Sequence, residues 1–299
     1  MAGLLTIGEC MIELSGGQDA LYRQGFAGDT LNTAWHARAQ LPAIHDVGYF
    51  TAIGTDSMSE RMLHFFEDAG LQTNQILRIE DRRPGLYMIE QKDGDRHFTY
   101  WRDQSAAKLM AQDETRLGQA LASAGWLYFS GISLAILAPD ARARLLTALK
   151  AAKSGGARLA FDPNIRPALW SSAEEIRTTI TEAASLCDIL LPSFDDEAHH
   201  FGDADPAATC ARYSEATKGH AEIIVKDSGN PVHLRTPDGT ELIDVPAIAQ
   251  VVDATGAGDS FNGAYLAARM QGMTPRDAVP RAIATSGRVI GHHGAIPRD

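Results

Sequence analysis

The chain has 299 residues, of which 44% are hydrophobic, and this is enough for one large α/β domain with a buried core. Its 27 Lys and Arg residues against 38 Asp and Glu residues give a formal net charge of −11, which repels nucleic acids and anionic membrane surfaces at long range. The sequence therefore predicts no nucleic-acid or membrane partner, and no apolar run in it is long enough to span a bilayer.

The three cysteines, Cys10, Cys187 and Cys210, are odd in number and lack the close pairing of a metal or redox motif, which fits a reducing compartment. The N-terminal sequence has no basic flank before its apolar run. It breaks at Gly8 and Glu9, so it is typical of a first strand rather than of a signal peptide. We expect a cytoplasmic protein.

Short apolar runs recur along the chain, each ending near a turn-forming or polar residue. In chain order they are Leu4 to Gly8, Trp126 to Gly131, Leu159 to Pro163, Ile189 to Ser193 and Ile223 to Lys226. Helical periodicity is found at Ser57 to Ala69, Asp140 to Lys153, Ala173 to Ala184 and Ser260 to Met270. We therefore predict an α/β fold with a doubly wound, mostly parallel sheet and helices on both of its faces.

Two segments interrupt this alternation, Cys10 to Gly28 and Pro84 to Arg102. Both have the pattern of short strands around turns, and Lys92-Asp93-Gly94-Asp95 is a hairpin signal. We expect them to form a small β-sheet lid from residues of about 10–30 and 84–103. The chain has no internal repeat and no Pro/Ser-rich linker, so the lid is predicted to be an insertion in a single domain of residues 1–299.

In a doubly wound sheet, ligands bind beyond the carboxyl ends of the strands. Four sites follow predicted strands and should border one cleft: Gly131, the segment Asp162 to Arg166, Ser193 and Asp227. We expect the chemistry of the protein in this cleft.

A glycine-rich turn, Asp253-Ala-Thr-Gly-Ala-Gly-Asp259, leads into the last predicted helix. Gly256 and Gly258 let a ligand approach the backbone, while the free amides and dipole of the helix start favour an anion. Asp259 is then placed to take a proton from an attacking hydroxyl. The alternative is a tight turn in which Asp259 only caps the helix. The turn lacks the Gly-Lys-Ser/Thr of a Walker loop, and it lies too near the C-terminus for a dinucleotide fingerprint.

The run DATGAGDSF at residues 253–261 resembles the second signature of the ribokinase/PfkB carbohydrate kinases. This resemblance implies that ATP is the phosphate donor and that Asp259 is the catalytic base. It also implies that the amides of Gly256, Ala257 and Gly258 form an anion hole.

A second match, Gly28-Asp29-Thr-Leu-Asn32, is similar to the sugar-binding Gly-Gly-x-x-x-Asn element of the same family, with Ala27 in place of the first glycine. It implies that Gly28, Asp29 and Asn32 bind the sugar, since the Asn amide can both donate to and accept from hydroxyls. The alternative is a turn followed by an Asn-capped helix.

Further segments, spread over nearly the whole chain, resemble the bacterial 2-keto-3-deoxygluconate kinases of this family. They are Ile7 to Leu14, Pro84 to Tyr87, Phe98 to Arg102, Ser130 to Leu137 and Asp162 to Trp170. The resemblance implies substrate contacts from Tyr87, Tyr100, Arg102, Ile132 and Arg166. A 2-keto acid needs a carboxylate site, which Arg102 and Arg166 could supply through charge-assisted hydrogen bonds. The alternatives are a lid packed by aromatic residues with Arg102 in solvent, and an ion pair between Arg166 and Asp162.

The resemblance also implies which residues lie near ATP: Ser193, Lys226, Ser228 and Gly229, together with Gly256 and Gly258 of the turn. Ser228 stands where the family commonly has a glycine after the lysine. The family often has Asn-x-x-Glu after the strand ending at Leu191, whereas this chain has Ser193-Phe-Asp-Asp-Glu197. Asp196 and Glu197 are the residues expected to organise Mg²⁺ through water.

Together these features predict ATP-dependent phosphorylation of the 6-hydroxyl of 2-keto-3-deoxy-D-gluconate, giving the 6-phosphate and ADP. A kinase for the galactonate epimer or for another sugar such as fructose is left open. A sugar-binding regulator would be expected to lack the base or the anion hole, and an NAD-dependent oxidoreductase would carry Gly-x-Gly-x-x-Gly in an early βαβ unit. The lid needs cover for its outer face and edges, and lid pairing is common in the family, so we expect a homo-oligomer assembled through the lids.

Overall fold

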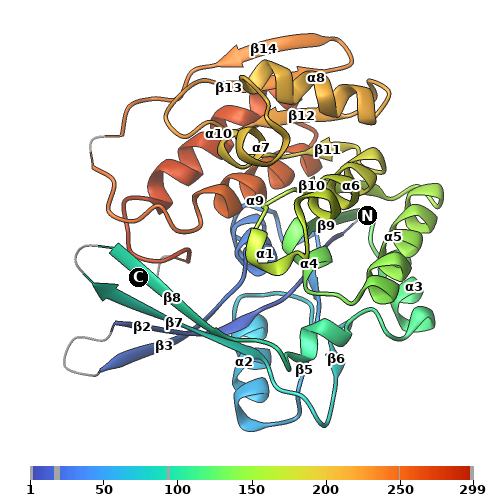
Figure 1. Cartoon of the computed structure of the whole chain (residues 1–299), viewed down its shortest axis with the longest axis vertical. Coiled ribbons are helices and arrows are strands. Elements are labelled where there is room, and N and C mark those ends of the chain that lie inside the picture. Colours follow the sequence, from blue (N-terminus) through green and yellow to red (C-terminus); the bar gives the residue numbers. More distant parts are fainter. Residues whose placement is uncertain (1–2, 17–20, 93–94, 249, 297–299) are drawn as a thin grey trace.

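An eight-stranded sheet runs through the centre of the computed structural model, which describes residues 3–16, 21–92, 95–248 and 250–296 (Figure 1). The order across the sheet is β14 (Gly239–Ile243), β13 (Val232–Thr236), β12 (Glu222–Val225), β11 (Ile189–Leu190), β10 (Arg158–Asp162), β9 (Trp126–Ser130), β1 (Leu4–Ile7) and β4 (Val47–Phe50). The strands from β12 across to β4 are parallel, and β13 and β14 are antiparallel. The predicted, mostly parallel sheet is confirmed.

The strands send alternate side chains into two hydrophobic cores, one on each face of the sheet. In β9, Leu127 and Phe129 enter the first core, while Trp126 and Tyr128 enter the second. The first core is closed by α3 (Glu114–Ala122), α5 (Pro139–Ser154), α6 (Ala173–Ser185) and α8 (Pro206–Ala216). The second is closed by α1 (Asp29–Gln40), α2 (Ser57–Asp68), α9 (Ala257–Met270) and α10 (Pro275–Val289). Helices cover both faces, as predicted.

Shorter helical segments connect these elements: the 3₁₀ turns Ala106–Leu109 and Pro167–Leu169, α4 (Gly131–Ala135) and α7 (Phe194–Phe201). The helix expected from Ser260 begins three residues earlier, at Ala257. Strand β11 ends at Leu190, before the predicted Ser193, because Pro192 has no amide to continue the ladder. The chain nevertheless stays beside β12, since Lys226 N donates to the Pro192 carbonyl at 2.9 Å.

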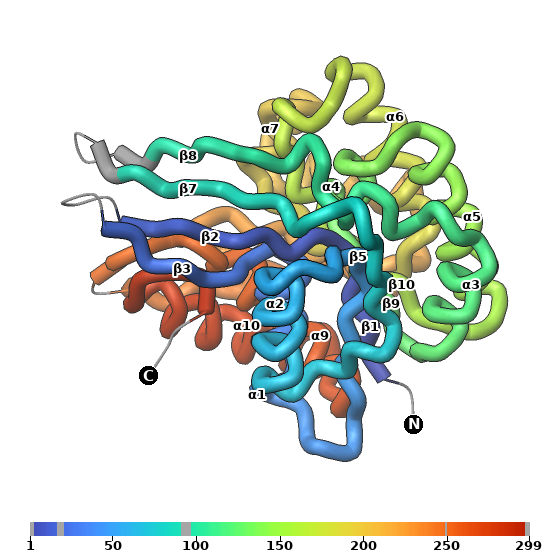
Figure 2. Tube along the Cα trace, turned by 90° about the horizontal axis from the view of Figure 1, so that it is seen from below, coloured from blue at the N-terminus to red at the C-terminus, as the bar shows by residue number. Residues whose placement is uncertain are grey.

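A second, four-stranded sheet lies beside the main body, in the order β3 (Tyr22–Ala27), β2 (Met11–Gly16), β7 (Gly85–Lys92) and β8 (Asp95–Trp101) (Figure 2). This small sheet is the one predicted from the two interrupting segments. Its strands β7 and β8 pair antiparallel, while residues 93 and 94 of the predicted hairpin turn lie outside the described residues. A short parallel pair, β5 (Ala52–Ile53) and β6 (Leu77–Arg78), lies nearby.

One face of the small sheet packs on α2. Ile12 and Phe26 are buried there, and the ring of Phe26 lies 5.5 Å from the ring of Phe65. Side chains alternate between the two faces of a strand, so the cross-strand neighbours Tyr87 and Tyr100 lie on the opposite face.

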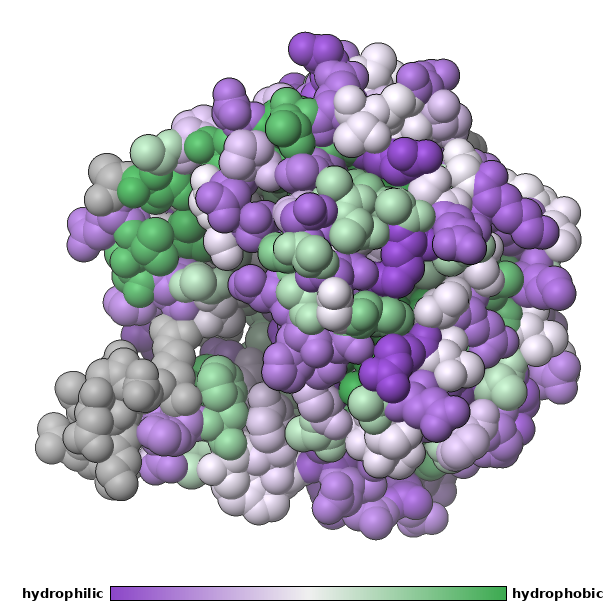
Figure 3. All heavy atoms as spheres, turned by 45° about the horizontal axis from the view of Figure 1, so that its top comes forward, coloured by the Kyte–Doolittle hydropathy of each residue, from purple (hydrophilic) through white to green (hydrophobic). Residues whose placement is uncertain are grey.

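The surface is largely hydrophilic, but hydrophobic side chains gather at its left in Figure 3, on the side where Figure 1 places the loop from β14 to α9. Exposed hydrophobic residues of this region are Leu242, Ile248, Val251 and Val252. No helix in the described part of the chain is long and apolar enough to cross a membrane.

Candidate active site

Asp259 lies in the first turn of α9, which begins where Gly256 adopts a left-handed conformation with φ of 76°. Gly256 is the N-cap, so the alternative that Asp259 only caps the helix is wrong. The amides of Gly258 and Asp259 precede the first helical hydrogen bond, from Ser260 N to the Gly256 carbonyl at 2.8 Å. With the helix dipole, these amides form a site suited to an anion.

Asn32 reaches Asp259 from the neighbouring helix α1. Its Nδ2 donates to Asp259 Oδ2 at 2.8 Å, and Thr33 Oγ1 donates to the Asp259 carbonyl at 3.2 Å. The helices come this close because Gly263 has no side chain: a Cβ there would lie 2.5 Å from the Thr33 carbonyl oxygen. Asn32 lies inside α1, whose N-cap is Gly28, so the alternative of an Asn cap is also wrong.

The starts of α1 and α4 supply the next predicted substrate residues. A Cβ on Gly28 would overlap the Glu9 carbonyl, so the chain requires glycine there. The carboxylate of Asp29 accepts a hydrogen bond from Asn164 Nδ2 at 2.8 Å. Ile132, in α4, is partly buried and packs against the first core.

The electrostatics at this end of α9 depend on the carboxylates of Asp259, Asp29 and Asp162 and on the ammonium of Lys226. Burial, and then the charge of Asp29, raises the pKa of Asp259 above its ordinary range, while the Asn32 hydrogen bond and the positive charge of Lys226 oppose this rise. Burial likewise raises the pKa of Asp29. A carboxyl group whose pKa is raised in this way is a better proton acceptor once it is ionised.

A pocket of about 530 Å³ opens beside the glycine turn. Six of the residues predicted for ATP or the anion hole line it: Ser193, Lys226, Ser228, Gly229, Ala257 and Gly258. Ser228 has φ of 50°, a backbone conformation that favours glycine, which accounts for the glycine commonly found there in the family.

Much of the pocket wall is apolar, and sequence reasoning missed these residues. They include Val232, Val245, Ala247, Ile248, Val251, Phe261, Ile283 and Ile290. They come from the strands after β12, the loop before α9, and helices α9 and α10, where apolar side chains have the same pattern as core residues. A wall of this kind suits a flat, weakly polar group such as a nucleotide base.

The small sheet brings the predicted lid residues together. Tyr87 is buried and its hydroxyl donates to Glu13, while Tyr100 is exposed, and the two rings lie 5.8 Å apart. The Arg102 guanidinium forms an ion pair with the buried carboxylate of Glu9 and lies 5.8 Å from the Tyr100 ring. Only 13% of the Arg102 side chain is exposed, so the alternative that it lies in solvent is wrong.

Arg166 follows β10, and 54% of its side chain is exposed. Its Nη1 donates to the Ile165 carbonyl at 2.8 Å and lies 3.5 Å from Asp196 Oδ2. The alternative of an ion pair between Arg166 and Asp162 is therefore wrong, because Asp162 pairs instead with Lys226. Arg166 is available to a ligand without breaking a buried contact.

The two carboxylates predicted for Mg²⁺ lie in different surroundings. Asp196 borders β10, where its Oδ2 accepts from Ile165 N at 3.1 Å, and burial raises its pKa. Glu197 is completely buried and accepts hydrogen bonds from Arg212 Nη2 at 2.6 Å and from the Tyr213 hydroxyl at 3.0 Å. Glu197 thus joins α7 to α8, and the structure does not bring it together with Asp196.

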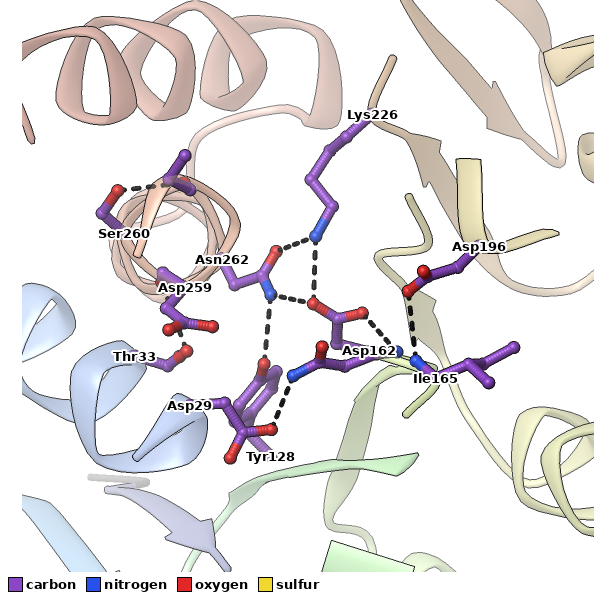
Figure 4. Close-up of polar contacts among 12 residues, drawn as sticks. Asp29, Thr33, Tyr128, Asp162, Ile165, Asp196, Lys226, Asp259, Ser260 and Asn262 are labelled. Atoms are coloured by element: carbon purple, nitrogen blue, oxygen red, sulfur yellow. Dashed lines mark hydrogen bonds and ion pairs between the residues drawn. The ribbon is translucent and has the colours of Figure 1, made fainter. Parts of the chain in front are cut away.

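A buried polar network lies between β10 and α9 (Figure 4). Asp162 Oδ2 accepts from Lys226 Nζ at 3.0 Å and from Asn262 Nδ2 at 2.6 Å, and Asn262 Nδ2 also donates to the Tyr128 hydroxyl at 3.0 Å. Sequence reasoning placed Asp162 and Lys226 at the cleft but missed Asn262 and Tyr128. The available signal was an Asn three residues after Asp259, in a helix segment that is otherwise mostly apolar.

Comparisons with known proteins agree with this geometry. The model of the pfkB family carbohydrate kinases matches residues 1–299. A 2-dehydro-3-deoxygluconokinase of Dickeya dadantii is 42% identical over 98% of this chain and 96% of its own length, and one of Escherichia coli K12 is 41% identical over 99% and 97%. A solved fructokinase of Xylella fastidiosa with bound ATP has a TM-score of 0.84 and 23% identity, covering 98% of this chain and 93% of that one. As its two signatures predict, this chain belongs to the pfkB family of carbohydrate kinases.

Proposed function

We propose that this protein transfers the γ-phosphoryl group of ATP to the 6-hydroxyl of 2-keto-3-deoxy-D-gluconate, also called 2-dehydro-3-deoxygluconate. The observation that carries the proposal is the Asp259 carboxylate, held by Asn32 beside the amides at the start of α9. The name shared by the Dickeya and Escherichia relatives, which align over almost the whole chain, supports this substrate.

In the proposed reaction, Asp259 accepts the proton of the 6-hydroxyl. The hydroxyl oxygen forms a bond to the γ-phosphorus, and the bond from that phosphorus to the β,γ-bridging oxygen breaks. The electron pair leaves with ADP, and the proton on Asp259 is then released to solvent. The amides of the Gly256–Gly258 turn stabilise the negative charge on the transferred group, since phosphoryl transfer depends mainly on positioning and electrostatics.

The acceptor side is proposed to bind the acid sugar through the residues named above. Asn32 Oδ1 is buried and has no hydrogen-bond partner within the described residues, so it can accept from a sugar hydroxyl next to the base. Arg166 and Arg102 would bind the carboxylate, with Arg166 the more accessible. The other proposed contacts are Gly28, Asp29, Tyr87, Tyr100 and Ile132.

ATP is proposed to occupy the 530 Å³ pocket, with the base against its apolar wall and the phosphates at the glycine turn. Ser193, Lys226, Ser228 and Gly229 would contact the nucleotide. The Xylella fructokinase with bound ATP shares the fold and supports this donor.

Mg²⁺ would neutralise charge on the β- and γ-phosphates when bound with ATP. Of the two predicted carboxylates, Asp196 fits this role, since 26% of its side chain is exposed and it borders the cleft. Glu197 does not fit, because both its oxygens are enclosed by Arg212 and Tyr213. The neighbouring carboxylate of Asp195 lines the nucleotide pocket and therefore fits the role better than that of Glu197.

The lid role of the small sheet, a homo-oligomer assembled through it and a cytoplasmic location are also proposals. Trp101, 56% exposed at the end of β8, is a large hydrophobic surface that pairing would cover. A monomeric mass in solution would contradict the oligomer. The three cysteines are free and buried, in keeping with a reducing compartment.

Release of ADP, measured with a coupled assay across three acceptors, tests the proposed function. We expect the highest kcat/KM with 2-keto-3-deoxygluconate, a lower value with its galactonate epimer and the lowest with fructose, which lacks the carboxylate. A higher kcat/KM with fructose or with the epimer would identify that sugar, and not 2-keto-3-deoxygluconate, as the substrate. Sugar binding without ADP release would favour a non-catalytic regulator.

A further inference from the structure

The side-chain amide of Asn262 is fixed in the site by three contacts (Figure 4). Asn262 is completely buried on α9, close to Asp259. Its Nδ2 donates to Asp162 at 2.6 Å and to the Tyr128 hydroxyl at 3.0 Å, and its Oδ1 accepts from Lys226 at 3.1 Å. A flipped amide would direct its NH₂ group at an ammonium and its oxygen at a carboxylate. These neighbours therefore set its orientation.

Lys226 is the group in this network that reaches the nucleotide site. It directly follows β12, lines the nucleotide pocket, and only 11% of its side chain is exposed. Its Nζ lies 3.5 Å from the position that a Cβ on Gly258 would occupy, so the ammonium lies against the glycine turn. An ammonium has three donors. Asp162 and Asn262 are its hydrogen-bond partners among the described residues, which leaves one donor for an incoming anion.

A lysine needs such partners to act at one point. Its ammonium ends a flexible four-carbon chain, and ordering that chain costs rotamer entropy. Asp162 also offers a counter-charge in a buried place. The two partners lie on different elements, β10 and α9, so Lys226 is held where the sheet edge meets the start of α9.

We propose that Asn262 and Asp162 are positioning residues for phosphoryl transfer: they hold the Lys226 ammonium at the glycine turn, where it stabilises the negative charge of the transferred phosphoryl group. This inference rests on the proposed kinase function and adds a cation and its support to it. The simpler role is structural, in which the network only fastens α9 to β9 and β10. The two roles differ in whether Asn262 acts through Lys226.

A double-mutant cycle of Asn262→Leu and Lys226→Met separates these roles. Each single variant should lower kcat by about 10- to 100-fold, the range for a hydrogen bond to a charged group. The double variant should be no slower than Lys226→Met alone, because Asn262 has no further effect once the ammonium is gone. Losses that multiply, or wild-type kcat in Asn262→Leu, would overturn the inference.

Tyr128→Phe is the matched control. It removes one hydrogen-bond partner of Asn262 but leaves Lys226, Asp162 and the Asn262 carbonyl in place. We expect a lower melting temperature, with kcat within about twofold of wild type, because a neutral hydrogen bond contributes mainly to stability. A loss of kcat as large as that of Asn262→Leu would assign the effect to packing and overturn the positioning role.

The exchange variant Asp162→Asn with Asn262→Asp keeps the inference testable where Asn262→Leu does not fold. It retains one carboxylate and one amide beside Lys226, so kcat should exceed that of Lys226→Met by at least about fivefold if the ammonium is still held. A folded exchange variant as slow as Lys226→Met would count against the inference. The kinase activity of the wild type is measured first. An inactive wild type would contradict the proposed function. With an active wild type, the variants test the role of Asn262 alone.

Discussion

The proposed acceptor site and the proposed nucleotide pocket meet at the start of α9 but are formed by different kinds of side chain. On the acceptor side, charged and amide side chains hold one another at defined distances, as Asn32 and Asp259 do at 2.8 Å. The nucleotide pocket is walled largely by aliphatic side chains from several elements. Function should therefore depend on a few residues on the acceptor side and be spread over many on the nucleotide side.

The largest expected effect is that of Asp259→Asn. The amide cannot accept the proton of the attacking hydroxyl, so kcat should fall by about two to four orders of magnitude, the range for loss of a general base. The affinity for ATP, measured by calorimetry, should remain close to that of the wild type. Near-wild-type turnover would remove Asp259 from the mechanism.

Arg102→Leu tests stability at the root of the small sheet. The substitution leaves the Glu9 carboxylate, 1% exposed, without its ion-pair partner. Breaking one partner of a buried pair costs about 3–5 kcal/mol, so the free energy of unfolding measured in urea should fall by that amount. The control is Arg166→Ala, whose side chain is 54% exposed and which should unfold like wild type. Equal stability of the two variants would contradict the difference drawn between these arginines.

Arg166→Ala also tests carboxylate recognition without the complication of unfolding. Loss of a charge-assisted hydrogen bond should raise KM for 2-keto-3-deoxygluconate by about 10- to 100-fold and leave KM for ATP nearly unchanged. Arg177→Ala, on the exposed side of α6, is the matched control and should change neither constant. An unchanged KM in Arg166→Ala would move carboxylate binding elsewhere.

Ile248→Ala is expected to have a modest effect on the nucleotide side. Ile248 lines the pocket and is 38% exposed, so its truncation removes apolar contact with the base but little core packing. KM for ATP should rise by about five- to tenfold, with kcat unchanged. The control is Leu242→Ala, because Leu242 is exposed on β14 and is not part of the pocket wall. A rise in KM for ATP of more than two orders of magnitude would show that nucleotide binding depends on this one residue and is not spread over many.

The smallest expected change is in the pH profile. Burial and the charge of Asp29 raise the pKa of Asp259, and Asp259 must be ionised to act as the proposed base. The kcat/KM should therefore fall as pH decreases through this raised pKa, at a pH above the ordinary range of a carboxyl group. Asp29→Asn removes the neighbouring charge, so the fall of kcat/KM on the acid side of the pH profile should shift to lower pH. No shift, or a shift upward, would contradict the electrostatic coupling of the two carboxylates.

The sequence predicted the elements of the fold well because strand and helix periodicities are local. The two signatures, through their resemblance to a family, also implied that Asn32 and Asp259 serve one reaction, although the residues are 227 positions apart and their hydrogen bond was not predicted. What local pattern alone could not supply was the direction of each side chain. Glu197 and Asp196 are adjacent, yet one lies in a buried ion pair with Arg212 and the other borders the cleft.

The nucleotide wall and the Arg102 ion pair were missed for related physical reasons. An apolar residue in a binding pocket, such as Ile248, has the same sequence pattern as a core residue, so composition does not separate the two. The partner of Arg102 is Glu9, 93 positions away, and two pairings in the small sheet, β2 with β7 and β7 with β8, bring the two segments together. Such ion pairs depend on the register between strands that are far apart in the chain, and local sequence patterns do not show that register.

Identification of the product tests the central claim most directly. The wild-type protein is incubated with ATP and 2-keto-3-deoxygluconate, and the product is examined by phosphorus–proton NMR correlation. The proposed chemistry predicts one new phosphate ester, coupled to the protons on carbon 6, formed in equal amount with ADP. A phosphate on another carbon, or release of inorganic phosphate in place of an ester, would contradict it.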